Sequence, residues 1–393
     1  MKLLPLLLTA LLASSSLCAQ NYDESKVGTY TLPDVLKLES GKSVTSKKVW
    51  EQQRRSEILG LFEEHVYGQF PTSYDKLEYS VKREDPKAMN GKAHLKEMEL
   101  VVYKNNKPVK INLVLFVPTA AKGPAPAFLL INNRSRRNTA PERDTLSGFW
   151  PAEMVINAGY AVAAFHNSEL APDNKNSYQN GVLQLYPEQL NADNGMKAIG
   201  AWAWGASRVL DYFEKDPTID AKRVAVVGHS RGGKASLWAA AQDQRFAICV
   251  SNCSGNTGAA LSRRNFGETV TRINTTFPHW FSTNYKKYND KEDELPVDQH
   301  MLIALIAPRP IYVTNASKDL WADPTGTFLA MKEAERVYNL FGLKSALPQS
   351  PPPINTPVVH PPMGYHNREG SHDLTEYDWA RFIELANYHY KKK

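Results

Sequence analysis

The chain has 393 residues, of which 42% are hydrophobic and 22% are charged, and its 47 basic and 41 acidic residues give a net charge of +6. This balance is ordinary for a soluble globular protein, and it excludes wholesale disorder and a multi-span membrane protein. The largest basic run, residues 391–393, is short and lies at the chain end, so we expect no nucleic-acid partner.

The first 19 residues have the order of a secretory signal peptide. A lysine precedes an apolar stretch over residues 3–12, and small residues follow up to Ala19. This order predicts cleavage after Ala19 and export of residues 20–393 to the periplasm or the medium, and the stretch is too short for a permanent membrane span. Cys18 raises the alternative of a lipid anchor, which the large side chain of Leu17 before it disfavours.

Two cysteines, Cys249 and Cys253, remain after that cleavage. Along an extended segment their Cα atoms would lie about 13 Å apart at ~3.3 Å per residue, which is too far for a disulfide. Their spacing fits no zinc motif. We therefore expect two free, buried thiols and a fold that depends on its hydrophobic core.

The N-terminal part of the mature chain shows two patterns. Apolar residues recur at helical spacing over 58–66, which predicts a helix that begins behind Thr45 or Ser46 and ends at Gly68. Strict alternation of apolar and polar residues over 97–117, interrupted by a polar turn of two asparagines, then predicts a pair of strands.

From residue 127 onward, short apolar runs alternate with helical patterns. The runs that indicate buried strands are 128–131, 161–165, 224–227 and 311–313, and the clearest helical patterns are 199–213 and 379–386. Buried strands alternating with helices predict a largely parallel sheet with helices on both faces, the three-layer α/β class. The proline-rich residues 348–362 are expected to form a long loop, with a short strand at 358–359.

No internal repeat and no linker composition divide the chain. We therefore expect one large domain over residues 20–393, in which residues 20 to about 100 form an N-terminal extension. A monomer is expected.

Residues 224–234, Val-Ala-Val-Val-Gly-His-Ser-Arg-Gly-Gly-Lys, contain the motif G-x-S-x-G. The motif alone is weak, because a chain of this length contains it by chance about one time in eight at ~7% usage of Gly and Ser. Here, however, a buried strand precedes it and a helix follows it, as a nucleophile elbow requires. We predict that Ser230 is a nucleophile, held in strained backbone geometry with its hydroxyl exposed above the sheet.

A serine nucleophile needs a histidine base, and in this fold the base follows the serine and an acid along the chain. Of the ten histidines, the candidates are His279, His360, His366 and His372. His372 lies in a loop just before the final helix, where this topology delivers its base. It is the preferred base, with His366 as the second choice.

The acid is expected after a late parallel strand, at the edge where the carboxyl ends of the strands meet. Asp319 follows the predicted strand 311–313, and Asp323 is the competitor, although an aspartate before Pro324 is also typical of a turn or a helix cap. No HExxH motif or acidic metal cluster stands out, so we expect a site without metal or cofactor.

Seven short segments extend the pattern around the elbow: 228–234, 267–269, 298–301, 307–310, 321–324, 365–368 and 370–372. Together they resemble the glucuronoyl esterases of carbohydrate esterase family 15, with the bacterial branch as the better match, over most of the chain from about residue 44. The resemblance implies the α/β-hydrolase fold. It also implies hydrolysis, through an acyl-enzyme, of the ester between a 4-O-methyl-glucuronic acid of xylan and an alcohol of lignin.

The resemblance further implies roles for single residues. Arg231 would stabilise the oxyanion, Lys234 and Glu268 would contact sugar hydroxyls, and Trp321 would pack on the sugar. Without the resemblance, Lys234 and Glu268 would be interpreted as an ion pair and Trp321 as a core aromatic residue. Fungal members carry their acid as a Glu on the strand after the nucleophile helix, but residues 250–255 contain no acid here, which favours Asp319.

Other functions remain as alternatives. The runner-up is an acetyl xylan or feruloyl esterase, and a serine peptidase is more distant. A non-catalytic carbohydrate-binding protein is a different class, and the complete set of Ser230, Asp319 and His372 argues against it. The sequence leaves open the preferred alcohol, the need for the 4-O-methyl group and activity on galacturonate esters.

Overall fold

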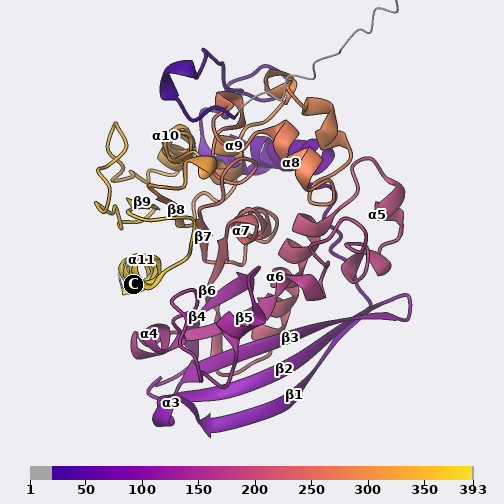
Figure 1. Cartoon of the computed structure of the whole chain (residues 1–393), viewed down its shortest axis with the longest axis vertical. Helices are drawn as coiled ribbons and strands as arrows, with labels where there is room; N and C mark the ends of the chain where they lie inside the picture. The colour runs from indigo at the N-terminus through magenta and orange to yellow at the C-terminus, as the bar shows by residue number, and fades with distance from the viewer. Residues whose placement is uncertain (1–19, 392–393) are drawn as a thin grey trace, which may run out of the picture.

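The computed structural model describes residues 20–391, which are built around one nine-stranded sheet (Figure 1). Its strands are β1 (Lys76–Lys87), β2 (Ala93–Lys104), β3 (Lys107–Pro118), β4 (Ala125–Asn132), β5 (Ala161–His166), β6 (Ile219–His229), β7 (Ile248–Asn252), β8 (Ile311–Ala316) and β9 (Met363–Arg368). Residues 1–19, which carry the predicted signal peptide, lie outside the described residues.

The α-helices are α1 (Lys47–Val49), α2 (Arg55–Phe62), α3 (Ala88–Gly91), α4 (Ala152–Asn157), α5 (Glu188–Asn191), α6 (Ala198–Phe213), α7 (Arg231–Gln242), α8 (Val270–Thr276), α9 (Gln299–Ala304), α10 (Pro324–Leu340) and α11 (Glu376–Lys391). A π-helical segment, η2 (Trp50–Arg54), joins α1 to α2, and a second, η3 (Glu63–Tyr67), continues α2, so that residues 47–67 form one helical stretch. That stretch is the predicted N-terminal helix, and the side chain of Ser46 caps it by accepting a hydrogen bond from the backbone of Val49.

The strands lie in the order β1-β2-β3-β5-β4-β6-β7-β8-β9. The pairs from β5 to β9 along this order are parallel, while β1, β2, β3 and β5 pair antiparallel. The carboxyl ends of β6, β7, β8 and β9 therefore meet at one edge of the sheet. This arrangement confirms the predicted α/β class with a largely parallel sheet.

Helices cover both faces of the sheet, with α6 and α7 on one side and α4 and α11 on the other (Figure 1). Alternate residues of each buried strand enter separate cores: Leu129 of β4 packs in the core on the α6 and α7 side, and Phe128 and Leu130 pack in the core on the α4 and α11 side. Continuous apolar runs arise because both faces are buried, as a parallel sheet requires.

One predicted strand is wrong, and strand β1 was not predicted, each for a physical reason. Strand β1 escapes prediction because its residues are exposed except for a half-buried Leu77, so no apolar period marks it. The strand expected at 358–359 is wrong: Val358 forms only an isolated bridge with Tyr365, and the real strand is β9. Strand β9 includes a glycine, a histidine, an asparagine and an arginine, whose polarity hides a buried strand.

Cys249 and Cys253 are free and buried, as predicted. Among residues 20–391, no helix has the length and apolar character needed to cross a membrane.

Candidate active site

Ser230 lies in the sharp turn between β6 and α7. Its backbone has φ 56° and ψ −126°, a conformation that a residue with a Cβ adopts only under strain. The backbone N–H of Ser230 donates to the carbonyl of Asn252 at 2.8 Å, which ties the turn to the end of β7. A Cβ on Gly228 would lie 1.9 Å from the carbonyl oxygen of Gly232, so the turn can close only with glycine there.

Gly228→Ala is expected to destabilise the protein by about 3 kcal/mol, because the added methyl group would clash with rigid backbone. The measurement is the free energy of unfolding in urea. The matched control is Gly123→Ala, since no atom lies within 4 Å of a Cβ at that position. Equal stability of the two variants would contradict this account of the turn.

His372 and Asp319 form a hydrogen-bonded pair beside this turn. The Nδ1 atom of His372 lies 2.6 Å from Oδ2 of Asp319. Asp319 follows β8 and is buried, whereas His372 lies in the loop after β9 with its side chain 34% exposed. Because the carboxylate engages Nδ1, Nε2 is the ring nitrogen left to exchange a proton. Ser230, Asp319 and His372 line one pocket, the Ser230 pocket, with a volume of about 320 Å³.

The structure places the competing base and acid elsewhere. His366 is fully buried, with Nε2 2.8 Å from Oδ1 of Asp378, and it does not line the Ser230 pocket. Asp323 binds the guanidinium of Arg264 at 2.8 Å and caps α10 by accepting from the backbone of Gly326 at 2.8 Å. The helix-capping interpretation of Asp323 is therefore the one that its contacts support.

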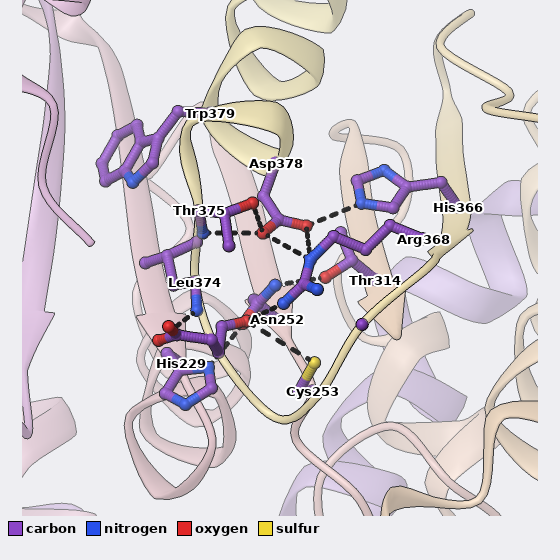
Figure 2. A network of polar contacts seen from close by, with 12 residues as sticks. His229, Asn252, Cys253, Thr314, His366, Arg368, Leu374, Thr375, Asp378 and Trp379 are labelled. Carbon is purple, nitrogen blue, oxygen red and sulfur yellow. Dashed lines mark hydrogen bonds and ion pairs between the residues drawn. The ribbon is translucent and has the colours of Figure 1, made fainter. Parts of the chain in front are cut away.

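A buried arginine holds the loop that carries His372 (Figure 2). The guanidinium of Arg368 donates to the backbone carbonyls of Ser371 at 3.1 Å and Asp373 at 2.7 Å, on either side of His372. Asp378 binds Arg368 at 3.0 Å and accepts from the backbone of Thr375 at 2.8 Å, which caps α11. Arg368 thus fixes the loop against the last helix.

The guanidinium of Arg231, the first residue of α7, is held by an ion pair at its edge and by aromatic rings against its planar face. One nitrogen of its guanidinium pairs with Asp173, and its plane lies over the rings of Trp280 at 4.7 Å and Phe277 at 5.3 Å. Asp173 also accepts hydrogen bonds from Trp280 at 2.7 Å and from His279 at 2.9 Å. Arg231, Phe277 and Trp280 line the Ser230 pocket, so this positive charge faces the site where an oxyanion would form.

Burial alone would raise the pKa of Asp173, but the hydrogen bond from His279, the charge of Arg231 and the hydrogen bond from Trp280 together lower it to about 2, well below the usual value for an aspartate. The folded protein therefore binds this proton more weakly than the unfolded chain. The resulting stabilisation, about 2 kcal/mol, is present above about pH 4 and is lost as the pH falls towards 2.

Asp173→Asn should remove this dependence. We expect the free energy of unfolding of the variant to lie below that of the parent protein at pH 7, and the difference to shrink as the pH falls from 4 to 3. Urea unfolding at several pH values measures it, with the exposed Asp144→Asn as a control. A difference that stays constant with pH would show that the Asp173 carboxylate is not the source.

Lys234 and Glu268 form a buried ion pair in the wall of the Ser230 pocket. The Nζ atom of Lys234 lies 2.8 Å from Oε2 of Glu268 and 2.7 Å from the carbonyl of Ser254, and it also donates to the carbonyl of Asn256. Burial lowers the pKa of Lys234, and the charge of Glu268 opposes that effect. The ammonium group uses all three protons inside the protein, so its predicted contact with sugar hydroxyls requires the exchange of one of these bonds.

Trp321 lies in the loop between Asp319 and α10 and is half-buried at the edge of the Ser230 pocket. It is not one of the core aromatic residues. The backbone N–H of Glu268 donates to the carbonyl of Trp321 at 2.9 Å, which joins the two loops that carry the expected sugar contacts.

One group of possible metal ligands is found among residues 20–391, and it overlaps the His372–Asp319 pair. Ligand atoms of Cys253, Asp319 and His372 lie within 4.8 Å of one another. Burial, reinforced by the charge of Asp319, raises the pKa of the Cys253 thiol well above its usual value. A neutral thiol is a poor metal ligand, so this group fits a hydrogen-bonded histidine–aspartate pair better than a metal centre.

Sequence reasoning did not find Asp173, Trp280, Phe277 or Arg368. Asp173 lies in a loop without a motif, and only the fold brings it to Arg231. Arg368 belonged to a segment that carried the resemblance, but a single buried arginine has no periodic signal. Its position four residues before the predicted base was the one available hint.

Taken together, a strained serine after a buried strand and a histidine–aspartate pair after the last two strands define a serine hydrolase of the α/β-hydrolase fold. The family model described as "Glucuronyl esterase, fungi" matches residues 100–342. Carbohydrate esterase MZ0003, from an unknown prokaryotic organism, is 42% identical over 94% of this chain and 92% of its own length.

A 4-O-methyl-glucuronoyl methylesterase of Schizophyllum commune is 30% identical over 84% of this chain and 79% of its own length. The solved structure of a glucuronoyl esterase from Solibacter usitatus has a TM-score of 0.86 and 41% identity, and the match covers 93% of this chain and 100% of that one. The chain belongs to the glucuronoyl esterases, carbohydrate esterase family 15.

Proposed function

We propose that the protein hydrolyses esters of 4-O-methyl-glucuronic acid, such as those that join glucuronoxylan to lignin alcohols. The observation that supports this most directly is the position of Arg231. This residue follows Ser230 in the sequence and lines the same pocket as Ser230 and His372. A fixed positive charge at this place suits an oxyanion and then the carboxylate of the product. The sugar-side residues Glu268 and Trp321 line the same pocket.

The reaction has two balanced halves. The Oγ atom of Ser230 attacks the ester carbonyl while its proton passes to Nε2 of His372, and Asp319 stabilises the resulting imidazolium through Nδ1. The tetrahedral intermediate collapses, the C–O bond to the alcohol breaks, and the same proton leaves with the alcohol oxygen. Water then attacks the acyl-enzyme by the same path and releases the uronic acid.

Arg231 is the proposed oxyanion donor, together with the backbone N–H groups at the start of α7, which have no partner within the helix. A donor of this kind contributes ~3–4 kcal/mol to the transition state. The contacts of Arg231 with Asp173 and Trp280 hold the guanidinium in place before the charge develops, so little reorganisation is needed.

Export is part of the proposal, since the substrate is a polymer outside the cell and the sequence begins with the pattern of a signal peptide. N-terminal sequencing of the protein recovered from the medium or the periplasm tests this, and we expect Gln20 as the first residue.

The test of the activity is a comparison of initial rates on the methyl esters of 4-O-methyl-glucuronate, glucuronate and galacturonate, and on acetylated xylan. We expect the highest kcat/KM on a glucuronate ester. Strong release of acetate without hydrolysis of any uronate ester would replace the proposal with the acetyl xylan esterase alternative. Binding of xylan fragments without turnover would favour the carbohydrate-binding alternative.

A further inference from the structure

The first residues of the described chain lie against two loops that supply part of the wall of the Ser230 pocket. We call residues 20–26 the N-terminal strap, residues 264–268 the first wall loop and residues 320–323 the second wall loop. The strap, indigo in Figure 1, lies near α9 and α10. None of its residues lines the Ser230 pocket, whereas Glu268 of the first wall loop and Trp321 of the second do.

Gly267 is held between the strap and the second wall loop. Its backbone N–H donates to the carbonyl of Asn21 at 2.8 Å. Its φ is +64°, and a Cβ there would lie 2.5 Å from the carbonyl oxygens of Leu320 and Trp321. The next backbone N–H, that of Glu268, donates to the carbonyl of Trp321 at 2.9 Å. The strap therefore contacts the first wall loop at the residue where the two wall loops meet.

A buried arginine makes a second connection, through side chains. The guanidinium of Arg264 donates to Glu24 of the strap at 2.7 Å and to Asp323 of the second wall loop at 2.8 Å. The side chain of Arg264 is 5% exposed, so these charge-assisted bonds hold it between the two carboxylates. The ring of Tyr22 packs edge-on against Phe266 at a centroid distance of 6.2 Å. The strap thus holds the first wall loop by a backbone hydrogen bond, an ion pair and an aromatic contact.

The proposed acid, which precedes the second wall loop, is held from a different direction. The backbone N–H of Lys318 donates to the carbonyl of Gly370 at 2.9 Å, which ties the end of β8 to the loop after β9. Asp319 comes next and pairs with His372 at 2.6 Å. We therefore expect a change in the strap to displace the two wall loops and to leave the acid and the base in place.

We propose that the N-terminal strap positions Glu268 and Trp321 for the sugar half of the ester and takes no part in the chemical step. Lys234 holds the carboxylate of Glu268 from within the pocket wall at 2.8 Å, so the strap adjusts the place of this group and is not its sole support. Loss of the strap contacts should weaken the binding of the uronate and raise KM, whereas kcat depends on Ser230 and His372. The assignment rests on the proposed function, to which the sugar contacts belong.

The experiment compares the parent protein with the double variant Tyr22→Ala, Glu24→Ala on two esters. The methyl ester of glucuronate uses the sugar contacts, whereas p-nitrophenyl acetate has no sugar and needs only the nucleophile, the base and the acid. We expect KM for the glucuronate ester to rise about 10-fold at nearly constant kcat. The value of kcat/KM for p-nitrophenyl acetate should stay within a factor of about two of that of the parent protein.

The matched control is Asp23→Ala, which changes the residue between the two altered positions. Among residues 20–391, the carboxylate of Asp23 bonds only within the strap, to Ser25 and Lys26, so KM should not change. Glu24→Gln keeps an oxygen that can accept a hydrogen bond from Arg264. It should therefore raise KM less than Glu24→Ala does.

Two results would overturn the assignment of the strap while leaving the proposed function intact. One is an unchanged KM for the glucuronate ester in the double variant. The other is an equal fall in kcat on both esters, which would show that the strap affects only the fraction of protein that is folded. A parent protein that hydrolyses p-nitrophenyl acetate but no uronate ester would overturn the proposed function, and the assignment of the strap with it.

Discussion

Ser230→Ala is expected to abolish hydrolysis of glucuronate esters, with a fall in kcat of about 10⁶-fold. The reason is chemical: alanine offers no oxygen to attack the carbonyl, and His372 and Asp319 then have no nucleophile to activate. Substrate binding should persist, because Arg231, Glu268 and Trp321 remain in the Ser230 pocket. The measurements are kcat on the methyl ester and the affinity of the variant for glucuronate.

The backbone supplies a check on this variant. Alanine and serine both carry a Cβ, so the strained turn at φ 56° is equally costly for both, and the free energy of unfolding should change little. Ser56→Ala is a suitable control, since that exposed hydroxyl bonds only to the carbonyl of Gln53. A Ser230→Ala protein that is folded and retains more than a few per cent of the rate would rule out Ser230 as the nucleophile.

Asp319→Asn is expected to lower kcat by up to ~10⁴-fold with little change in KM. The carboxylate accepts the hydrogen bond from Nδ1 of His372 at 2.6 Å, and this fixes the tautomer that leaves Nε2 free to take a proton. An amide in its place can donate to Nδ1 and thereby stabilise the opposite tautomer. The charge that offsets the imidazolium is lost as well.

Asp323→Asn is the matched comparison, because this aspartate lies four residues away in the same loop. Its carboxylate binds Arg264 and caps α10, so its replacement should lower the free energy of unfolding and change kcat only a few-fold. If Asp323→Asn lost the larger part of kcat and Asp319→Asn did not, the orienting acid would be Asp323.

The elements that the sequence predicts well are those with an apolar period or a fixed motif. Strands β4, β5, β6 and β8 are buried on both faces and appear as apolar runs, and the elbow around Ser230 has glycines that its geometry demands. Strand β9 is as deeply buried, yet within it His366 is hydrogen-bonded to Asp378 and Arg368 forms an ion pair with the same carboxylate, in place of apolar packing. Periodicity and motifs within a segment do not predict a hydrogen-bonding partner that another helix or strand supplies, as α11 supplies Asp378 here.

The site shows the same division. The order of Ser230, Asp319 and His372 follows from topology, whereas the anchor of Arg231 could not be foreseen, because Asp173 reaches it from a loop 58 residues earlier. The sequence left two interpretations of Lys234 and Glu268 open: a buried ion pair, or a pair of residues that contact the sugar. Their 2.8 Å separation establishes the ion pair, and the contact with sugar stays a prediction.

The network around Arg368 also has a consequence for the order in which the enzyme becomes active during synthesis. The proposed nucleophile, acid and oxyanion arginine are all translated before β9. The proposed base, together with Arg368 and Asp378, which hold its loop, lies within Met363–Lys391. A chain that lacks this last stretch has no His372 in the wall of the Ser230 pocket and therefore no group to accept the serine proton. We therefore expect ester hydrolysis to begin only after the C-terminal helix has docked, so that the appearance of activity would report that the last segment of the chain has folded.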